Sequence, residues 1–115
     1  MSITVYAIPN CDTVKKARSW LSERRIEYLF WDYKKVGVEG ERVAAWISQA
    51  GADKVLNRAG TTFKKLPNEA KADLNGDRMV ALLVKHPSAI KRPIVEYPGG
   101  LLVGFKATEW ETVFG

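Results

Sequence analysis

The residue best suited to chemistry in this chain is its single cysteine, Cys11. It follows an alternating, β-branched segment at residues 2–8 and precedes residues 12–25, whose apolar positions fall at helical spacing. A sulfur at such a junction faces the unpaired amide groups and the positive dipole end of the helix. These interactions favour the thiolate and can lower a cysteine pKa from about 8.5 to about 3.5–7.5. The sequence therefore predicts a reactive thiol at Cys11 rather than a buried structural one.

Two neighbours of Cys11 refine this prediction. Asp12 and Thr13 carry oxygens that can cap the same helix, which specifies where the helix begins. The Asp12 carboxylate also repels a thiolate, so we expect the pKa of the cysteine to be lowered only moderately.

The residues after Cys11 constrain its mechanism. The residue three positions on is Val14, so the chain lacks a Cys-x-x-Cys pair. A disulfide formed on Cys11 cannot be resolved within the chain, and the resolving thiol must come from glutathione or another protein. Chemistry that uses two thiols of the same chain is thereby excluded.

Composition indicates an ordinary globular protein. The chain has 115 residues, of which 46% are hydrophobic and 27% charged, so we expect a single domain over residues 1–115. One cysteine fits a reducing compartment, and neither a signal peptide nor an apolar run of the roughly 20 residues needed to cross a bilayer is recognised. We expect a cytoplasmic monomer with no membrane partner.

The net charge of +5 does not indicate nucleic-acid binding. The lysines and arginines are scattered along the chain and interleaved with acids, instead of forming one aromatic-flanked stripe. A solvated surface that can help to attract small anions explains the charge better, and we expect no nucleic-acid partner.

The order of the expected elements defines a fold class. A strand, a helix and a second strand at residues 26–31 form a βαβ unit with parallel strands. A helical region follows, with helices at residues 41–50 and 77–86 and a glycine-containing loop with short helical turns over residues 51–75. The remaining elements are a hairpin and a terminal helix: strands at 94–97 and 101–104 around Pro98–Gly100, and a helix opened by a capping box at residues 108–111. This order predicts an α/β fold of the thioredoxin/glutaredoxin type, with a mixed four-stranded sheet and a helical insertion at about 34–90 after the second strand.

Three motifs, in order and at compatible spacing, resemble one known family. Residues 9–17 (PNCDTVKKA) resemble the nucleophile loop of the arsenate reductase (ArsC) family. Residues 56–66 contain LNR followed by GTTFKKL, which is similar to that family's insert segment, and residues 87–95 (PSAIKRPIV) resemble a third family segment. Within the family the chain most resembles the YffB subgroup.

The resemblance implies roles for particular residues. Cys11 matches the nucleophile, and Arg58 and Arg92 match two arginines that bind an oxyanion beside it. Pro93 matches the cis-proline that faces the cysteine in thioredoxin-like folds, and Asn10 belongs to the nucleophile loop. Arsenate reductases of this type carry a third arginine after the hairpin, where this chain offers Lys106, a point charge without the arginine fork.

Three functions follow from these features. The first is a glutathione-dependent thiol oxidoreductase, acting on a disulfide or small oxyanion, with glutathione as co-substrate and no bound cofactor or metal. The second is an arsenate reductase coupled to glutathione and glutaredoxin. The third is a non-enzymatic regulator that resembles the Spx proteins and binds RNA polymerase, although the Spx redox switch uses a Cys-x-x-Cys pair that Val14 interrupts.

Overall fold

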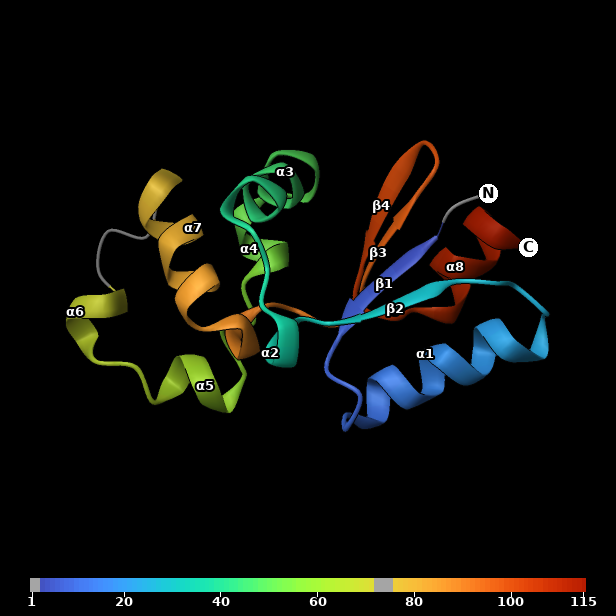
Figure 1. Cartoon of the computed structure of the whole chain (residues 1–115), viewed down its shortest axis with the longest axis horizontal. Coiled ribbons are helices and arrows are strands. Elements are labelled where there is room, and N and C mark those ends of the chain that lie inside the picture. The colour runs from blue at the N-terminus through green and yellow to red at the C-terminus, as the bar shows by residue number, and fades with distance from the viewer. Residues whose placement is uncertain (1–2, 72–75) are drawn as a thin grey trace. The chain divides into compact units, whose positions relative to one another are not determined.

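The computed structural model describes residues 3–71 and 76–115, and these form two compact units (Figure 1). The first unit joins the chain up to Tyr33 with residues 92–115 and contains the sheet. The second unit is residues 34–91 and is helical.

The first unit is built on a mixed four-stranded sheet. Its strands are β1 (Thr4–Ala7), β2 (Leu29–Asp32), β3 (Ile94–Tyr97) and β4 (Gly100–Val103), in the order β2-β1-β3-β4. Strand β1 is parallel to β2 and antiparallel to β3, and β3 is antiparallel to β4. This topology confirms the predicted fold class.

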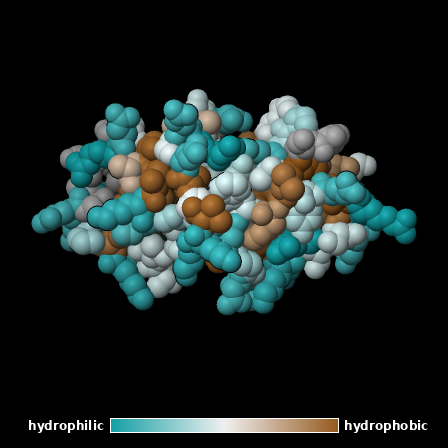
Figure 2. Space-filling model, viewed as in Figure 1, coloured by the Kyte–Doolittle hydropathy of each residue, from teal (hydrophilic) through white to brown (hydrophobic). Residues whose placement is uncertain are grey.

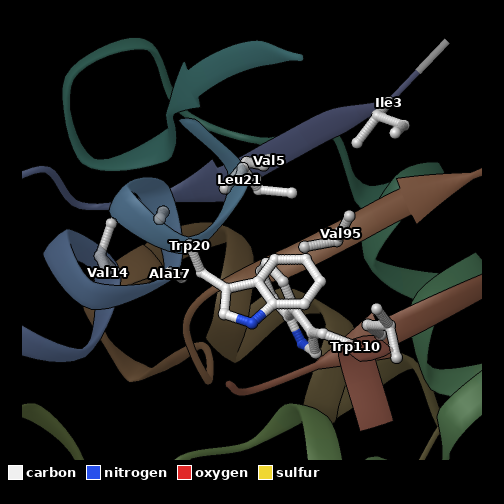
Figure 3. Packing of buried hydrophobic residues seen from close by; sticks show 10 residues of the cluster. Ile3, Val5, Val14, Ala17, Trp20, Leu21, Val95 and Trp110 are labelled. Carbon is white, nitrogen blue, oxygen red and sulfur yellow. The ribbon is translucent and has the colours of Figure 1, made fainter. Parts of the chain in front are cut away.

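Two helices, α1 (Asp12–Glu23) and α8 (Ala107–Phe114), pack against the sheet through one hydrophobic core (Figure 3). The predicted inward stripe of α1 is confirmed, because Val14, Ala17 and Leu21 are fully buried. Burying a valine or leucine side chain such as Val14 or Leu21 stabilises the fold by about 1.5–3 kcal/mol relative to leaving it exposed. The core also includes these residues: Ile3, Val5, Ala7, Trp20, Val95, Leu102 and Trp110.

Strand β2 begins three residues later than predicted, because of how α1 ends. Arg25 adopts a positive φ of 57°, its N–H donates to the Ser22 carbonyl, and the Ile26 N–H donates to the Leu21 carbonyl. This pair of bonds is a Schellman motif, with arginine where glycine is usual. Ile26 packs against the core from the motif itself, so regular pairing starts only at Leu29.

The terminal hairpin and helix differ from the prediction by one residue each. The turn is Pro98–Gly99, with Gly99 at φ 97°, and Gly100 already pairs with Tyr97 as the first residue of β4. Helix α8 begins at Ala107 with Lys106 as its N-cap, so the predicted capping box at Thr108 is wrong. Lys106 takes that position because its carbonyl accepts the Trp110 N–H, at 3.0 Å, which places Thr108 inside the first turn.

The second unit contains most of the helices. The predicted helices at 41–50 and 77–86 are present as α3 (Gly40–Ala50) and α7 (Gly76–Lys85), which pack on each other with Val43, Trp46, Met79 and Leu83 buried. The region predicted as a loop with short turns contains three short helices, while residues 72–75 lie outside the described residues. The remaining elements are α2 (Tyr33–Val36), whose first residue belongs to the sheet unit, α4 (Ala52–Val55), α5 (Thr61–Lys64), α6 (Asn68–Lys71) and the 3₁₀ helix η1 (Pro87–Ala89).

In the second unit, backbone hydrogen bonds join the chain at the end of α4 to the chain at the end of η1. The Asn57 N–H donates to the Ala89 carbonyl at 2.8 Å, and the Lys91 N–H donates to the Val55 carbonyl at 2.7 Å. Leu56 and Ile90 form an isolated antiparallel bridge between these bonds, and both side chains are buried. These bonds therefore fix the position of residues 89–91 within the helical unit.

On the face drawn in Figure 2, hydrophobic residues reach the surface in patches separated by hydrophilic ones. The large apolar side chains that are most exposed are Leu29, Trp31, Val36 and Val84. Among residues 3–71 and 76–115, no helix is both long enough and apolar enough to span a bilayer.

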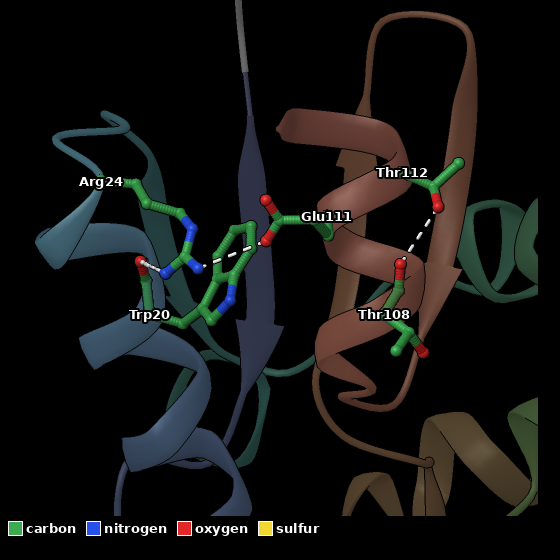
Figure 4. A network of polar contacts seen from close by, with 5 residues as sticks. All are labelled: Trp20, Arg24, Thr108, Glu111 and Thr112. Carbon is green, nitrogen blue, oxygen red and sulfur yellow. Dashed lines mark hydrogen bonds and ion pairs between the residues drawn. The ribbon is translucent and has the colours of Figure 1, made fainter.

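Helices α1 and α8 are also joined by polar contacts at the surface (Figure 4). The Arg24 guanidinium stacks on the Trp20 ring, with its Cζ 3.9 Å from the ring centroid, and its Nη2 lies 3.3 Å from Glu111 Oε2. Both partners of this ion pair are exposed, so its contribution is at most about 1 kcal/mol. The apolar core beneath it provides most of the stability that holds the two helices in place.

Trp110 should be the most costly single truncation in the sheet unit. Its side chain is fully buried, packs edge-on against Trp20 and Phe105, and donates its indole N–H to the Gly104 carbonyl at 3.2 Å. We expect Trp110→Ala to lower the free energy of unfolding by about 3–5 kcal/mol in urea titrations followed by circular dichroism. Trp31→Ala, at a half-exposed tryptophan, is the control and should cost about 1 kcal/mol or less. Equal losses in the two variants would contradict this account of the core.

Candidate active site

Cys11 occupies the N-cap of α1, just beyond the end of β1. Its backbone is extended, with φ −136° and ψ 130°, and its carbonyl accepts the Lys15 N–H at 2.9 Å as the first bond of the helix. The cysteine itself is therefore the capping residue, and the predicted capping by Asp12 or Thr13 is wrong because both lie inside the first turn. The side chain is partly exposed, so a reagent can reach the sulfur.

The surroundings of Cys11 favour its thiolate. Partial burial by itself would raise the pKa of the thiol, but the backbone N–H groups of Val14 and Thr13 and the Arg92 side chain act in the opposite direction. Their combined effect holds the pKa of Cys11 below the ordinary value of a thiol. A lowered pKa of Cys11 agrees with the sequence-based expectation. Two kinds of group lower it: the amides at the start of the helix and one guanidinium from a distant part of the chain.

Arg92 is brought to Cys11 by the pairing of β3 with β1. These strands are antiparallel and Tyr6 pairs with Ile94, so the residues before Ile94 run alongside those that follow β1. The Arg92 side chain is partly buried and donates a hydrogen bond to the Cys11 sulfur. The Arg92–Pro93 peptide bond is cis, as the resemblance implied. Pro93 is buried, and its carbonyl accepts the Gly104 N–H at 2.8 Å, which ties this segment to the end of β4.

Tyr33 completes the cluster and was missed by the sequence analysis. It directly follows β2, is fully buried, and accepts a hydrogen bond from the Arg92 guanidinium. Burial raises the pKa of Tyr33 to about 12, although the positive charge of Arg92 opposes that rise. One signal could have found it, since polar side chains at the carboxyl end of a parallel strand commonly face a ligand site.

Arg92 keeps its charge between these two partners. Burial alone would lower the pKa of the guanidinium, but its hydrogen bonds and electrostatic interactions with Tyr33 and Cys11 raise it. A guanidinium has five N–H donors in a planar fork, so it can donate hydrogen bonds to a phenol oxygen, a sulfur and an anion at the same time.

The other residues named from the sequence are Asn10, which directly precedes Cys11, and Lys106 and Arg58, which are distant from it in sequence. Asn10 and Lys106 belong to the sheet unit, and both are exposed. Arg58 belongs to the helical unit, where its Nη2 lies 3.6 Å from Asp53 Oδ1 and its Cζ lies 5.6 Å from the centroid of the Phe63 ring. The structure thus gives each a position, and their binding roles stay predictions.

The cluster combines a nucleophile with a cationic hydrogen-bond donor. A thiolate can attack a disulfide sulfur or another electrophilic atom, and the guanidinium can hold a carboxylate or oxyanion next to the reacting atom. In the part of the chain that the structure describes, His, Cys, Asp and Glu side chains form no group of three or more that could hold a metal ion.

Comparison with known proteins agrees with this geometry. The model of the ArsC family matches residues 6–113. A solved structure of a protein named YffB is 45% identical, with a TM-score of 0.95 and a match that covers 98% of this chain and 99% of the other. The solution structure of an arsenate reductase (ArsC) related protein from Brucella melitensis is 44% identical, with a TM-score of 0.76 and coverage of 99% and 95%.

A curated relative shows the same extent of similarity. An uncharacterized protein of Haemophilus influenzae is 38% identical over 112 residues, which is 97% of this chain and 98% of that protein. The family match, the relative and the two solved structures all extend over nearly the whole chain. The chain belongs to the ArsC family.

Proposed function

We propose that this protein is a glutathione-dependent thiol oxidoreductase in which Cys11 is the nucleophile. The observation that carries the proposal is the Cys11 sulfur, partly exposed at the N-cap of α1 and hydrogen-bonded by Arg92. Both interactions favour the thiolate, which is the reactive form in thiol–disulfide exchange.

The proposed reaction has two exchange steps. The Cys11 thiolate attacks the glutathione sulfur of a mixed disulfide, the old S–S bond breaks, and the substrate leaves as its thiolate. A second glutathione thiolate then attacks the glutathione sulfur bound to Cys11, which releases oxidised glutathione and restores the Cys11 thiolate. In the net reaction the mixed disulfide of substrate and glutathione reacts with one free glutathione thiolate, and the products are the substrate thiolate and oxidised glutathione. The single cysteine of the chain makes this external thiol necessary.

Arg92 would bind the anionic part of the substrate. Glutathione carries two carboxylates, and the fork of an arginine suits a carboxylate better than the point charge of a lysine. Asn10, Arg58 and Lys106 are proposed as further contacts to the same ligand, on the strength of the family resemblance. The chemistry requires a compartment that supplies reduced glutathione, in keeping with the expected cytoplasmic location.

Arsenate reduction is the second candidate. The name of the Brucella melitensis relative favours it, and Cys11 with Arg92 provides a nucleophile and an oxyanion binder. Lys106 weighs against it, because a lysine cannot replace the bidentate contacts of a third arginine. Turnover of arsenate with glutathione and glutaredoxin, compared with Cys11→Ser, distinguishes the two activities.

The Spx-like alternative lacks its redox switch in this chain, and it would be favoured only by stable binding of the purified protein to RNA polymerase.

The central prediction is a mixed disulfide on Cys11. Treatment with oxidised glutathione should add one glutathionyl group to the intact protein, and reduced glutathione should remove it, as followed by mass spectrometry. Cys11→Ser should gain no such group. Arg92→Gln should form the adduct about tenfold more slowly near pH 7, since a hydrogen bond to a charged group contributes about 1.5–3 kcal/mol. A wild-type protein that forms no adduct would refute the proposal.

The second prediction concerns pH. The rate of adduct formation should rise with pH as Cys11 loses its proton and level off once the thiolate is fully formed. Because the pKa of Cys11 is lowered, the midpoint should fall below that of an ordinary thiol measured with the same reagent, and Arg92→Gln should move it upward. Lys91→Gln is the matched control, since it removes an exposed neighbouring charge and should leave the midpoint unchanged. Equal shifts in both variants would mean that general charge, not the Arg92 contact, controls the thiol.

A further inference from the structure

We propose that Tyr33 is a positioning residue, whose buried hydroxyl holds the Arg92 guanidinium beside the Cys11 sulfur. The inference rests on the proposed function for its purpose, since it explains how the nucleophile is kept ready. It concerns a residue that neither the motifs of the sequence nor the residue roles implied by the family resemblance include.

The position of Tyr33 is fixed by the backbone around it. Strand β2 pairs with β1 so that Asp32 lies opposite Ala7, which puts Tyr33 level with the segment that leads from β1 to Cys11. The chain turns into α2 at Tyr33, and the side chain is fully buried. A buried tyrosine has two side-chain torsions and close-packed neighbours, so its hydroxyl is held at a defined place.

Ordering the Arg92 side chain has a cost. An arginine side chain is long, and fixing it costs conformational entropy. The Arg92 side chain is only partly buried, so packing constrains it less than it constrains Tyr33. A hydrogen bond to the Tyr33 hydroxyl orders the guanidinium before any substrate arrives, which places the remaining N–H donors towards the sulfur and its ligand.

A tyrosine suits this role better than a carboxylate. Burial keeps the Tyr33 hydroxyl neutral, with its pKa raised to about 12, so it accepts a hydrogen bond without cancelling the positive charge of Arg92. That charge stays available to the Cys11 thiolate and to an anion. Electrostatic interactions with Arg92, Cys11 and Asp32 all act on Tyr33, and Arg92 is a cation among them.

The test compares Tyr33→Phe with wild type by ultraviolet titration of the Cys11 thiolate and by the rate of alkylation, without glutathione. We expect the Tyr33→Phe titration midpoint to move to higher pH and alkylation near pH 7 to slow several-fold, with equal rates at high pH where both thiols are ionised. Tyr6→Phe is the matched control, because Tyr6 is also buried and its hydroxyl bonds to Glu96 Oε1 at 3.0 Å; it should change neither value.

The double variant Tyr33→Phe/Arg92→Gln separates positioning from other effects. If Tyr33 acts through Arg92, the double variant should shift the midpoint no further than Arg92→Gln alone. An unchanged midpoint in Tyr33→Phe, or fully additive shifts in the double variant, would overturn the inference. Because glutathione is absent, these outcomes are independent of whether the mixed disulfide forms.

A second measurement covers the case in which Tyr33→Phe does not fold. In Cys11→Ser the Tyr33 hydroxyl still accepts a hydrogen bond from the Arg92 guanidinium, so NMR should show a resolved Arg92 Nε–H signal with slow solvent exchange, as in wild type. Fast exchange of Arg92 in Cys11→Ser would show that Cys11, not Tyr33, orders the guanidinium, and would also overturn the inference.

Discussion

The hydrogen bond from Arg92 to the Cys11 sulfur connects two segments that are far apart in sequence, and the chemistry of the site depends on it. The amides at the start of α1 stabilise the thiolate by themselves, but partial burial of the sulfur acts against them. The guanidinium adds a charge-assisted hydrogen bond and a compensating positive charge. It therefore favours the reactive form of the thiol, and in the proposed function the same guanidinium binds an anion next to it.

The order of the strands is what allows this contact. Strand β1 lies between β2 and β3, parallel to one and antiparallel to the other. The carboxyl ends of β1 and β2 therefore meet the amino end of β3 at one edge of the sheet. Cys11 follows the first of these ends, Tyr33 follows the second and Arg92 precedes the third, so the topology brings the three residues together. The core formed by α1, α8 and the sheet keeps that edge in place.

Local patterns in the sequence were enough for some of these features. Alternation and helical spacing located β1, α1 and the hairpin strands, and the strand-to-helix junction singled out Cys11. Strand β2 was placed too early, because the Schellman motif at Arg25 uses a residue type that seldom adopts a positive φ. Tyr33 escaped notice because its role depends on long-range pairing and burial, which a single tyrosine after a strand does not reveal. The contact from Arg92 was expected only through the family resemblance, for the same reason.

A lowered pKa of Cys11 has opposite effects on two properties that the proposed cycle uses. It makes Cys11 a better leaving group when an external thiol attacks its mixed disulfide, but it also reduces the intrinsic nucleophilicity of the thiolate. The guanidinium and the two amides that act on the partly exposed sulfur set the balance between these effects, because they are the groups that lower its pKa.

The same contacts connect the site to stability. Since the folded-state pKa lies below that of the unfolded thiol, their contribution to folding is complete above about pH 8.5 and is lost as pH falls through the folded-state pKa. In the proposed cycle, glutathionylation removes the thiolate at any pH, and with it the contact between the Arg92 guanidinium and a charged sulfur. That contact is regained when Cys11 leaves, which favours release of the proposed adduct by the second glutathione.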